Sequence, residues 1–332
     1  MKIFLSQVKI YFQLLRNYQK IAIKKSFYFY IFSMPIFGLP FFLLSKIILK
    51  IKSNYLINFF LEMWIFKSAL RFLSGKERHY IANTLNSYNT LNNNVSTNIE
   101  LDEETKNKIK QLNEDGYCNL GKFFSDEECE NFIQSLQNKN CFNSQTPMQS
   151  DGKIMEFQPK DDIFSSSAYF VFLPKATLSF LPIQKLLNDK KFKFIINSYL
   201  NFNWKIYSCI TWYNPATNSK HYAHRLHRDT EDYRFLSLFI NWNKVTESNG
   251  SLTYIKKSHR LDIDNLKNNE IFIGGDRGSA FLADLNGLHA GKQVLEGYRY
   301  VTNIRFGKDV TCSSIVDGFI QAPTSQELEF EN

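Results

Sequence analysis

From about residue 203 onward the chain consists of short stretches rich in aromatic and β-branched side chains, and turn sequences such as Asn286-Gly287 separate them. Such stretches between turn signals predict β-strands, and in the last of them, 300–306, apolar and polar residues alternate. We therefore expect strands over five ranges: 205–213, 235–242, 251–255, 280–284 and 300–306.

Helical patterns come before these strands. Residues 101–116 have acidic residues in the first turn and a glycine at the end, which predicts a helix, and a short strand is expected over 117–124. Ser125 and Glu128 have the spacing of a capping box in front of a second helix. Pro182 opens a third, which extends to about Leu200. This order predicts an α+β fold built on a double-stranded β-helix (a jelly-roll, cupin-like barrel) with flanking helices.

The first 75 residues differ from the rest in charge. They hold eleven Lys or Arg residues and a single acid, Glu62, whereas the remainder of the chain carries a net charge of −2. The basic residues alternate with Phe, Ile and Leu. This pattern favours contact with an anionic membrane surface over nucleic acid, because nucleic-acid-binding proteins usually carry the basic patch on the folded domain. We expect no nucleic-acid partner.

Residues 26–45 contain no charge and are flanked by lysines. Twenty apolar residues are just long enough to cross a bilayer as a helix. Pro35, Gly38 and Pro40 interrupt helical continuity, and the lysines on both sides give no orientation. The segment could span a membrane, lie on its surface, or form a buried helical hairpin packed on the main domain.

These patterns divide the chain into four parts. Residues 1–85 form a basic, apolar helical segment, a candidate membrane anchor; 86–100 form an Asn- and Ser-rich linker; 101–320 form the jelly-roll domain; and 321–332 form a tail. The five cysteines are scattered without a CxxC pair, which fits a reducing compartment. We expect a cytoplasmic catalytic domain, attached to the cytoplasmic face of a membrane if the first segment is an anchor.

One short motif in the body of the chain has the chemistry of a metal site. His227 and Asp229 are two residues apart, so on an extended strand their side chains point the same way. An imidazole and a carboxylate, with a second histidine from a distant strand, form the facial triad of non-haem Fe(II) oxygenases. The alternative is a surface pair of a histidine and a carboxylate on a loop.

Further along the chain, two more residues fit such a site. His289 follows a predicted strand and a tight turn between glycines, where it could approach a metal or cap a backbone carbonyl. Arg299 begins the last predicted strand, and a buried arginine in a barrel needs an anionic partner, which a carboxylate matches in shape. Arg299 could instead be exposed, and Arg305 is a competing candidate for the same role.

In order and spacing, these motifs resemble the phytanoyl-CoA dioxygenase-like branch of the Fe(II)/2-oxoglutarate oxygenases. The resemblance covers roughly residues 101–310. It includes the H-x-D motif at 227–229, E-S-N-G-S-L-T-Y-I-K-K-S-H at 247–259, G-D-R-G-S-A-F-L-A-D at 275–284, then His289 and Arg299. The stretch 113–132, with E-D-G-Y and F-F-S-D-E-E-C, is similar to the start of that family's domain.

The resemblance implies roles for particular residues. His227, Asp229 and His289 would bind Fe(II), and Arg299 would bind the distal carboxylate of 2-oxoglutarate. Either Ser208 or Tyr213 would add a contact to this co-substrate. His259 resembles a structural turn residue, and His224 is not expected to be a ligand. The chain departs from the family at Gly291, where several relatives carry a hydroxyl residue.

The resemblance also implies the reaction. Fe(II), 2-oxoglutarate and O2 would be used to hydroxylate a C–H bond of a small molecule, a lipid or a lipid-linked glycan, and the carboxylate ligand Asp229 favours hydroxylation over halogenation. Two alternatives come from other classes. One is a cupin-like metal enzyme that does not use 2-oxoglutarate, and the other is a catalytically silent, membrane-associated binding module.

Overall fold

The structure is a computed structural model that describes residues 74–89, 102–143, 156–157, 169–172, 174–202, 204–218, 221–229, 232, 234–263 and 267–307. The uncharged run 26–45, most of the basic segment 1–75 and the tail 321–332 lie outside these residues, so their roles stay predictions. Within the described part of the chain, no helix has the length and apolar character needed to cross a membrane.

Two antiparallel sheets form the centre of the fold. The larger has the strand order β1-β9-β6-β11-β5-β4-β2-β3 and the smaller the order β10-β7-β8. The strands of the larger sheet are β1 (Tyr117–Lys122), β2 (Cys141–Asn143), β3 (Glu156–Phe157), β4 (Phe170–Phe172), β5 (Lys205–Pro215), β6 (Leu236–Asn241), β9 (Ser279–Ala283) and β11 (Tyr298–Gly307). Those of the smaller sheet are β7 (Leu252–Ile255), β8 (Glu270–Ile273) and β10 (His289–Gly291).

The predicted mixture of helices and antiparallel sheet is confirmed. All five strands predicted in the second half are present, as β5, β6, β7, β9 and β11. The sequence analysis did not predict β8 and β10. Strand β10 is only three residues long and follows a turn, so it is too short to show any alternation of apolar and polar residues.

The alternation along the strands produces two apolar cores. On β11, Val301 belongs to the core between the two sheets, whereas Ile304 and Phe306 belong to the core under the helices. Arg299 lies two residues before Val301 and Arg305 lies four residues after it, so both share its face, toward the smaller sheet. The positions that face inward therefore include both arginines that the sequence analysis considered.

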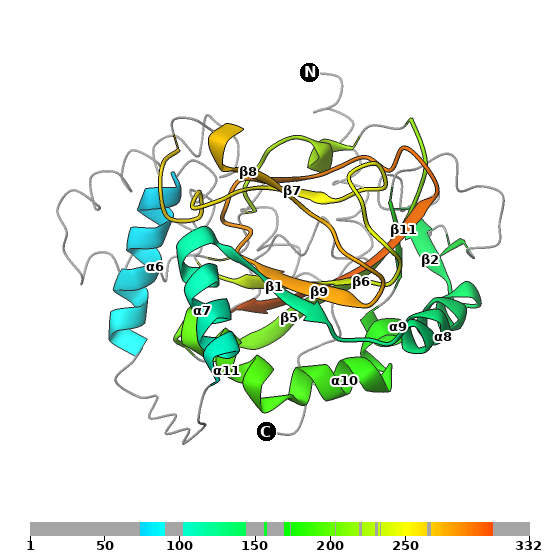
Figure 1. The fold of residues 1–332 in the computed structure, drawn as a ribbon, viewed down its shortest axis with the longest axis horizontal. Coiled ribbons are helices and arrows are strands. Elements are labelled where there is room, and N and C mark those ends of the chain that lie inside the picture. Colours follow the sequence, from blue (N-terminus) through cyan, green and yellow to red (C-terminus); the bar gives the residue numbers. More distant parts are fainter. Residues whose placement is uncertain are drawn as a thin grey trace, which may run out of the picture.

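Helices cover the outer face of the larger sheet. Figure 1 shows helices α8 to α11 along one side of this sheet and strands β7 and β8 on the other. These helices, together with the earlier α7, have the bounds α7 (Glu103–Asp115), α8 (Asp126–Gln137), α9 (Pro174–Leu178), α10 (Leu181–Asn188) and α11 (Lys190–Leu200). Trp242, which directly follows β6, packs against α8, because its indole stacks on Phe132 of that helix with 3.9 Å between ring centroids.

The capping box at Ser125 and Glu128 is confirmed, since each side chain accepts a hydrogen bond from the other residue's backbone N–H. The single helix predicted from Pro182 to Leu200 is a wrong prediction, because the chain breaks at Asp189. That residue is extended (φ −63°, ψ 130°), and its carboxylate accepts a hydrogen bond from the Phe192 backbone N–H. Asp189 thereby caps the second of two shorter helices.

A further helix, α6 (Gly75–Asn89), precedes the predicted domain. It begins with a capping box, in which Ser74 and Glu77 each accept a backbone hydrogen bond from the other. Its first residue lies so close to the loop after β7 that a Cβ at Gly75 would be 2.1 Å from the Ser258 carbonyl oxygen. The predicted boundary between 85 and 86 therefore falls inside a helix that packs on the domain.

Two glycines with positive φ, one packed against a tyrosine and one open to solvent, allow backbone strain to be separated from side-chain packing. Gly116 (φ +85°) ends α7, and a Cβ there would lie 2.3 Å from the Tyr254 hydroxyl oxygen, whereas a Cβ at Gly121 (φ +88°) would meet nothing within 4 Å. We expect Gly121→Ala to cost about 1–2 kcal/mol of stability, from backbone strain alone. Gly116→Ala should cost clearly more, because the tyrosine must also move. Urea unfolding measures both variants, and equal losses would contradict this packing.

Candidate metal and co-substrate site

His227, Asp229 and His289 converge at one point. One possible ligand atom from each side chain lies within 4.8 Å of the others. The Nε2 atoms of His227 and His289 lie 3.5 Å and 3.8 Å from Oδ1 of Asp229. The residues come from the loop after the 3₁₀ helix η4 (Tyr222–His224) and from β10. The sequence pattern identified all three residues.

Backbone hydrogen bonds place the two histidines side by side. The His227 N–H donates to the His289 carbonyl at 2.9 Å, and the His289 N–H donates to the His227 carbonyl at 3.0 Å. The two imidazole centroids are 4.4 Å apart. A third backbone bond, from the Asp229 N–H to the Leu285 carbonyl at 2.9 Å, fixes the carboxylate residue against the turn before β10.

The histidine tautomers suit metal binding. Nδ1 of His227 lies 2.7 Å from the Arg225 carbonyl oxygen, and Nδ1 of His289 lies 2.9 Å from the Gly287 carbonyl oxygen. A carbonyl oxygen only accepts, so each Nδ1 must carry the proton and donate. The lone pair of the neutral ring is then on Nε2, the atom that faces Asp229. This outer hydrogen bond is the usual way in which proteins orient a histidine ligand.

The electrostatics favour an ionised carboxylate beside a neutral imidazole. Burial alone would raise the pKa of Asp229, but His289, His227 and Arg305 together hold that pKa well below its usual range. Burial lowers the pKa of His289. The pKa of His227 is raised, since the hydrogen bond and charge of Asp229 outweigh burial. Two imidazole nitrogens and one carboxylate oxygen form a donor set that fits Fe(II) with open coordination positions.

Arg305 belongs to this cluster and not to the anion pocket for which it was a candidate. Its Nη2 lies 3.3 Å from Oδ2 of Asp229, whereas the two histidine Nε2 atoms approach Oδ1. Its Nε donates to Oδ1 of Asn303 at 2.9 Å. Arg305 therefore already has a carboxylate partner, and it binds the Asp229 oxygen that the two histidines do not approach.

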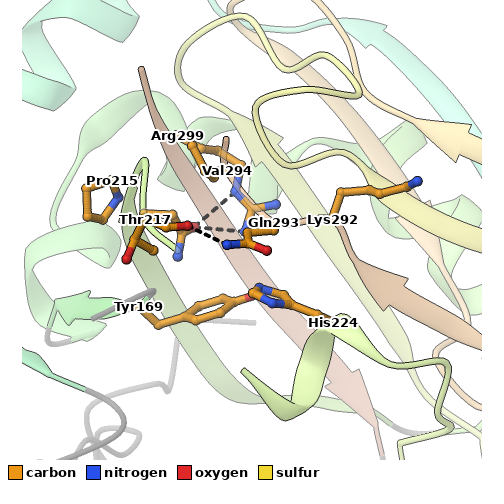
Figure 2. Close-up of a pocket in the computed structure, with 9 residues that line it drawn as sticks. Tyr169, Pro215, Thr217, His224, Lys292, Gln293, Val294 and Arg299 are labelled. Carbon is orange, nitrogen blue, oxygen red and sulfur yellow. Dashed lines mark hydrogen bonds between the residues drawn. The ribbon is translucent and has the colours of Figure 1, made fainter. Parts of the chain in front are cut away.

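Arg299 lies at a second position, where it lines a small pocket that Figure 2 shows. Its side chain is buried, with 7% of the residue exposed. Nε and Nη2 donate to Oδ1 of Asn214 at 3.0 Å and 2.8 Å, and Nη1 donates to the Gly250 carbonyl. The hydroxyl of Tyr169 is a further hydrogen-bond partner. All of these partners are neutral, so the pocket suits an anion.

Strand β10 connects the metal cluster to the pocket along the chain. The residues that follow this strand, from Lys292 to Val294, line the pocket, while His289 at the start of the strand belongs to the cluster. His224 also lines the pocket, with its ring centroid 5.8 Å from that of Tyr169. As expected, His224 is not part of the triad.

Neither of the two predicted auxiliary residues lines the Arg299 pocket. Tyr213 neighbours Asn214 on β5 and therefore points to the opposite face, where its ring lies 4.8 Å from that of Tyr300. Ser208 shares the inward face but pairs across the sheet with Arg305. The structure thus brings Ser208 toward the metal cluster and leaves Tyr213 among the aromatic side chains under the helices.

Tyr169 is the pocket residue that the sequence analysis missed. It stands in the run Y-F-V-F just before β4, which has the composition of an ordinary buried strand. Its hydroxyl oxygen would be 3.1 Å from a Cβ at Gly291. The tyrosine hydroxyl therefore occupies the space beside Gly291, the position at which the chain departs from the resembled family. No local sequence signal connects these two residues.

His259 has the structural position expected of it. Its Nε2 lies 3.2 Å from the Asn113 carbonyl oxygen, at the end of α7. The preceding Ser258 accepts a hydrogen bond from the Leu288 N–H at 2.7 Å and so fixes the residue before His289. This turn holds β10 in place and contributes no ligand to the cluster.

The two antiparallel sheets and the cluster of two histidines and an aspartate fit a non-haem metal oxygenase, and the comparison with known families agrees. The model of the phytanoyl-CoA dioxygenase family matches residues 112–294, more than half of the chain. The chain belongs to this family. It is a non-haem Fe/2-oxoglutarate-dependent oxygenase that uses iron, 2-oxoglutarate and O2. This assignment excludes the cupin-like enzyme without 2-oxoglutarate and the silent binding module as alternatives.

No curated protein matches the chain. Among solved structures, AviO1 from Streptomyces viridochromogenes is similar with a TM-score of 0.42 and 13% identity, covering 64% of this chain and 98% of that one. HygX from Streptomyces hygroscopicus, with nickel and 2-oxoglutarate bound, gives 0.43 and 13%, covering 62% and 87%. The epimerase SnoN, in complex with Fe3+, alpha ketoglutarate and nogalamycin RO, gives 0.45 and 10%, covering 67% and 91%.

The convergence of the triad predicts how single substitutions change metal binding. We expect His289→Ala to weaken Co(II) binding at least about 100-fold in the absence of 2-oxoglutarate, because one of three ligands is lost. His224→Ala is the matched control and should keep the wild-type dissociation constant, since His224 lies outside the triad. Isothermal titration measures both. Equal losses in the two variants would contradict this choice of ligands.

Proposed function

We propose that this protein hydroxylates a C–H bond of a small-molecule substrate, with Fe(II) held by His227, Asp229 and His289 and with 2-oxoglutarate anchored by Arg299. The observation that carries the proposal is the approach of both Nε2 atoms to one oxygen of Asp229. The two antiparallel sheets, with an apolar core between them, support a double-stranded β-helix as the scaffold.

The chain's own residues would perform distinct tasks. His227, Asp229 and His289 would hold the metal from one side and leave the remaining positions for ligands. Arg299 would bind the distal carboxylate of 2-oxoglutarate through its guanidinium, and the Tyr169 hydroxyl would donate a second hydrogen bond to it. Bound Fe(II) would supply the site at which O2 is reduced, as 2-oxoglutarate is converted to succinate and CO2 and the substrate is hydroxylated.

The carboxylate of the bound co-substrate would also compensate the energetic cost of burying the positive charge of Arg299. Burial lowers the pKa of this guanidinium, while its bond to Tyr169 opposes the change. A carboxylate opposite Arg299 would form a charge-assisted, bidentate pair in a site with little water. Both Asn214 and the carboxylate would accept hydrogen bonds from Arg299. Asn214 already accepts from Nε and Nη2, and these bonds fix the orientation of the guanidinium plane.

We propose a small molecule as the substrate class. HygX has been solved with hygromycin B bound, and SnoN with nogalamycin RO, so both of these similar structures hold small molecules. A lipid or lipid-linked glycan at the cytoplasmic face of a membrane is the other substrate class predicted from the sequence. Its basis is the basic, apolar segment 1–75, most of which lies outside the described residues. Vesicle flotation of the full chain tests this attachment.

Anaerobic titration with Fe(II) and 2-oxoglutarate tests the proposed function directly. A metal-to-ligand charge-transfer band should develop in the wild-type protein and be absent in His289→Ala. Arg299→Ala should weaken 2-oxoglutarate binding at least about 30-fold, since loss of a buried charged partner costs about 2 kcal/mol or more. Wild-type 2-oxoglutarate affinity in Arg299→Ala would place the co-substrate elsewhere.

A pair of tyrosines tests the pocket assignment. Tyr169→Phe should raise the apparent KM for 2-oxoglutarate about tenfold, because a hydrogen bond to a charged group contributes about 1.5–3 kcal/mol. Tyr213→Phe removes the same hydroxyl from the opposite face of the sheet and should leave that KM unchanged. Succinate release at varied 2-oxoglutarate concentration measures both. The reverse result would show that Tyr213 reaches the co-substrate.

A further inference from the structure

Helix α6 precedes the matched region 112–294, yet it carries a buried side chain to the metal cluster. Arg78 on this helix is fully buried, with 0% of the residue exposed. Its Nη1 donates to the main-chain carbonyl of Asp229 at 2.6 Å and to Oδ1 of Asn286 at 3.0 Å. These acceptors are 151 and 208 residues away along the chain.

The two acceptors of Arg78 belong to the two segments that carry the triad. Asp229 is itself the proposed carboxylate ligand, and Asn286 lies in the turn that leads to β10 and His289. Besides Arg78, the segments are joined by the bond from the Asp229 N–H to the Leu285 carbonyl and by Arg228, whose Nη1 donates to the Asn286 carbonyl at 2.6 Å. Arg78 therefore bridges the junction that sets the distance between the ligands.

The charge of Arg78 is balanced by the same region. Burial and the like charge of Arg228 lower the pKa of Arg78 to about 9, whereas Asp284 and Asp229 favour its protonated form. The guanidinium is therefore still charged at neutral pH. A buried charge with these partners is costly to remove, because the Asp229 carbonyl and the Asn286 amide oxygen would then lose their donor.

Contacts on either side of Arg78 hold the helix in this place. Gly75 packs against the Ser258 carbonyl, as described above, and the side chain of Asn83 accepts a hydrogen bond from Nη2 of Arg234 at 2.6 Å. Ala82, one helical turn beyond Arg78, is buried. Because both flanks are fixed to the domain, the guanidinium has little freedom to leave its acceptors.

We propose that Arg78 is a positioning residue for the metal centre, through which helix α6 fixes the Asp229 segment against the turn that carries His289. The inference rests on the proposed metal site at His227, Asp229 and His289. Outer residues that orient metal ligands typically contribute about 10–100-fold to metal affinity. A guanidinium suits this task because its donors are fixed in one plane and can serve two acceptors at once.

The test is Co(II) binding to the full-length protein in the absence of 2-oxoglutarate, read as a dissociation constant and as the visible spectrum of the bound ion. Arg78→Met should raise the dissociation constant roughly 10–100-fold and alter the spectrum. Arg78→Lys should give a smaller rise, because an ammonium group cannot keep both acceptors in the same geometry. Lys76→Met, at an exposed position of the same helix, is the control and should match the wild type.

A second variant keeps the test decisive if Arg78→Met does not fold. Asn286→Leu removes one acceptor, retains Arg78, and should also weaken Co(II) binding, while circular dichroism verifies folding. Wild-type affinity and spectrum in the folded variants would overturn the inference. If His289→Ala also binds Co(II) like the wild type, the metal lies elsewhere and the proposed function fails instead.

Discussion

The pair of backbone hydrogen bonds between His227 and His289 is the constraint on which the site depends. These bonds attach an otherwise irregular loop to the edge strand of the smaller sheet. Both imidazoles then point to the same side, and Asp229, two residues further on, joins them because side chains alternate along an extended chain. A metal site needs ligands fixed before the metal arrives, and main-chain bonds provide this more rigidly than side-chain contacts do.

Two buried arginines, Arg78 and Arg299, and the partly buried Arg305 surround the site, and their partners distinguish their roles. Arg305 is bonded to a carboxylate, Arg78 to a main-chain carbonyl and an amide, and Arg299 to neutral groups at the wall of a pocket. Arg299 and Arg305 lie on one face of one strand, so the strand pattern alone cannot separate them. The partner separates them, since only Arg299 combines a pocket with exclusively neutral hydrogen-bond partners among the described residues.

The sequence was sufficient for the elements with a clear period and for the ligands with a fixed spacing. The strands rich in aromatic and β-branched residues between turn signals were predicted, and the H-x-D motif with His289 identified the cluster. Side-chain contacts that depend on how two strands are paired could not be predicted from the sequence. Tyr213 and Asn214 are neighbours in sequence, yet only Asn214 reaches Arg299, because the pairing of β5 with β11 decides which of them faces inward. Tyr169 reaches the pocket from the residue just before β4, in a run that has no polar signature.

Helix α6 spans the boundary at 85 and 86 that composition predicted. Its start, G-K-E-R-H, has the charge density of a solvated surface, and its end runs into the Asn-rich stretch that predicted a linker. A sequence pattern cannot show that one of these charges is buried, since burial of Arg78 depends on acceptors from segments more than 150 residues away. The unit that builds the metal cluster therefore reaches back at least to Ser74. A truncation at residue 101 would remove Arg78 together with the basic segment, so a test of membrane attachment that keeps Arg78 in place must change only residues before Ser74.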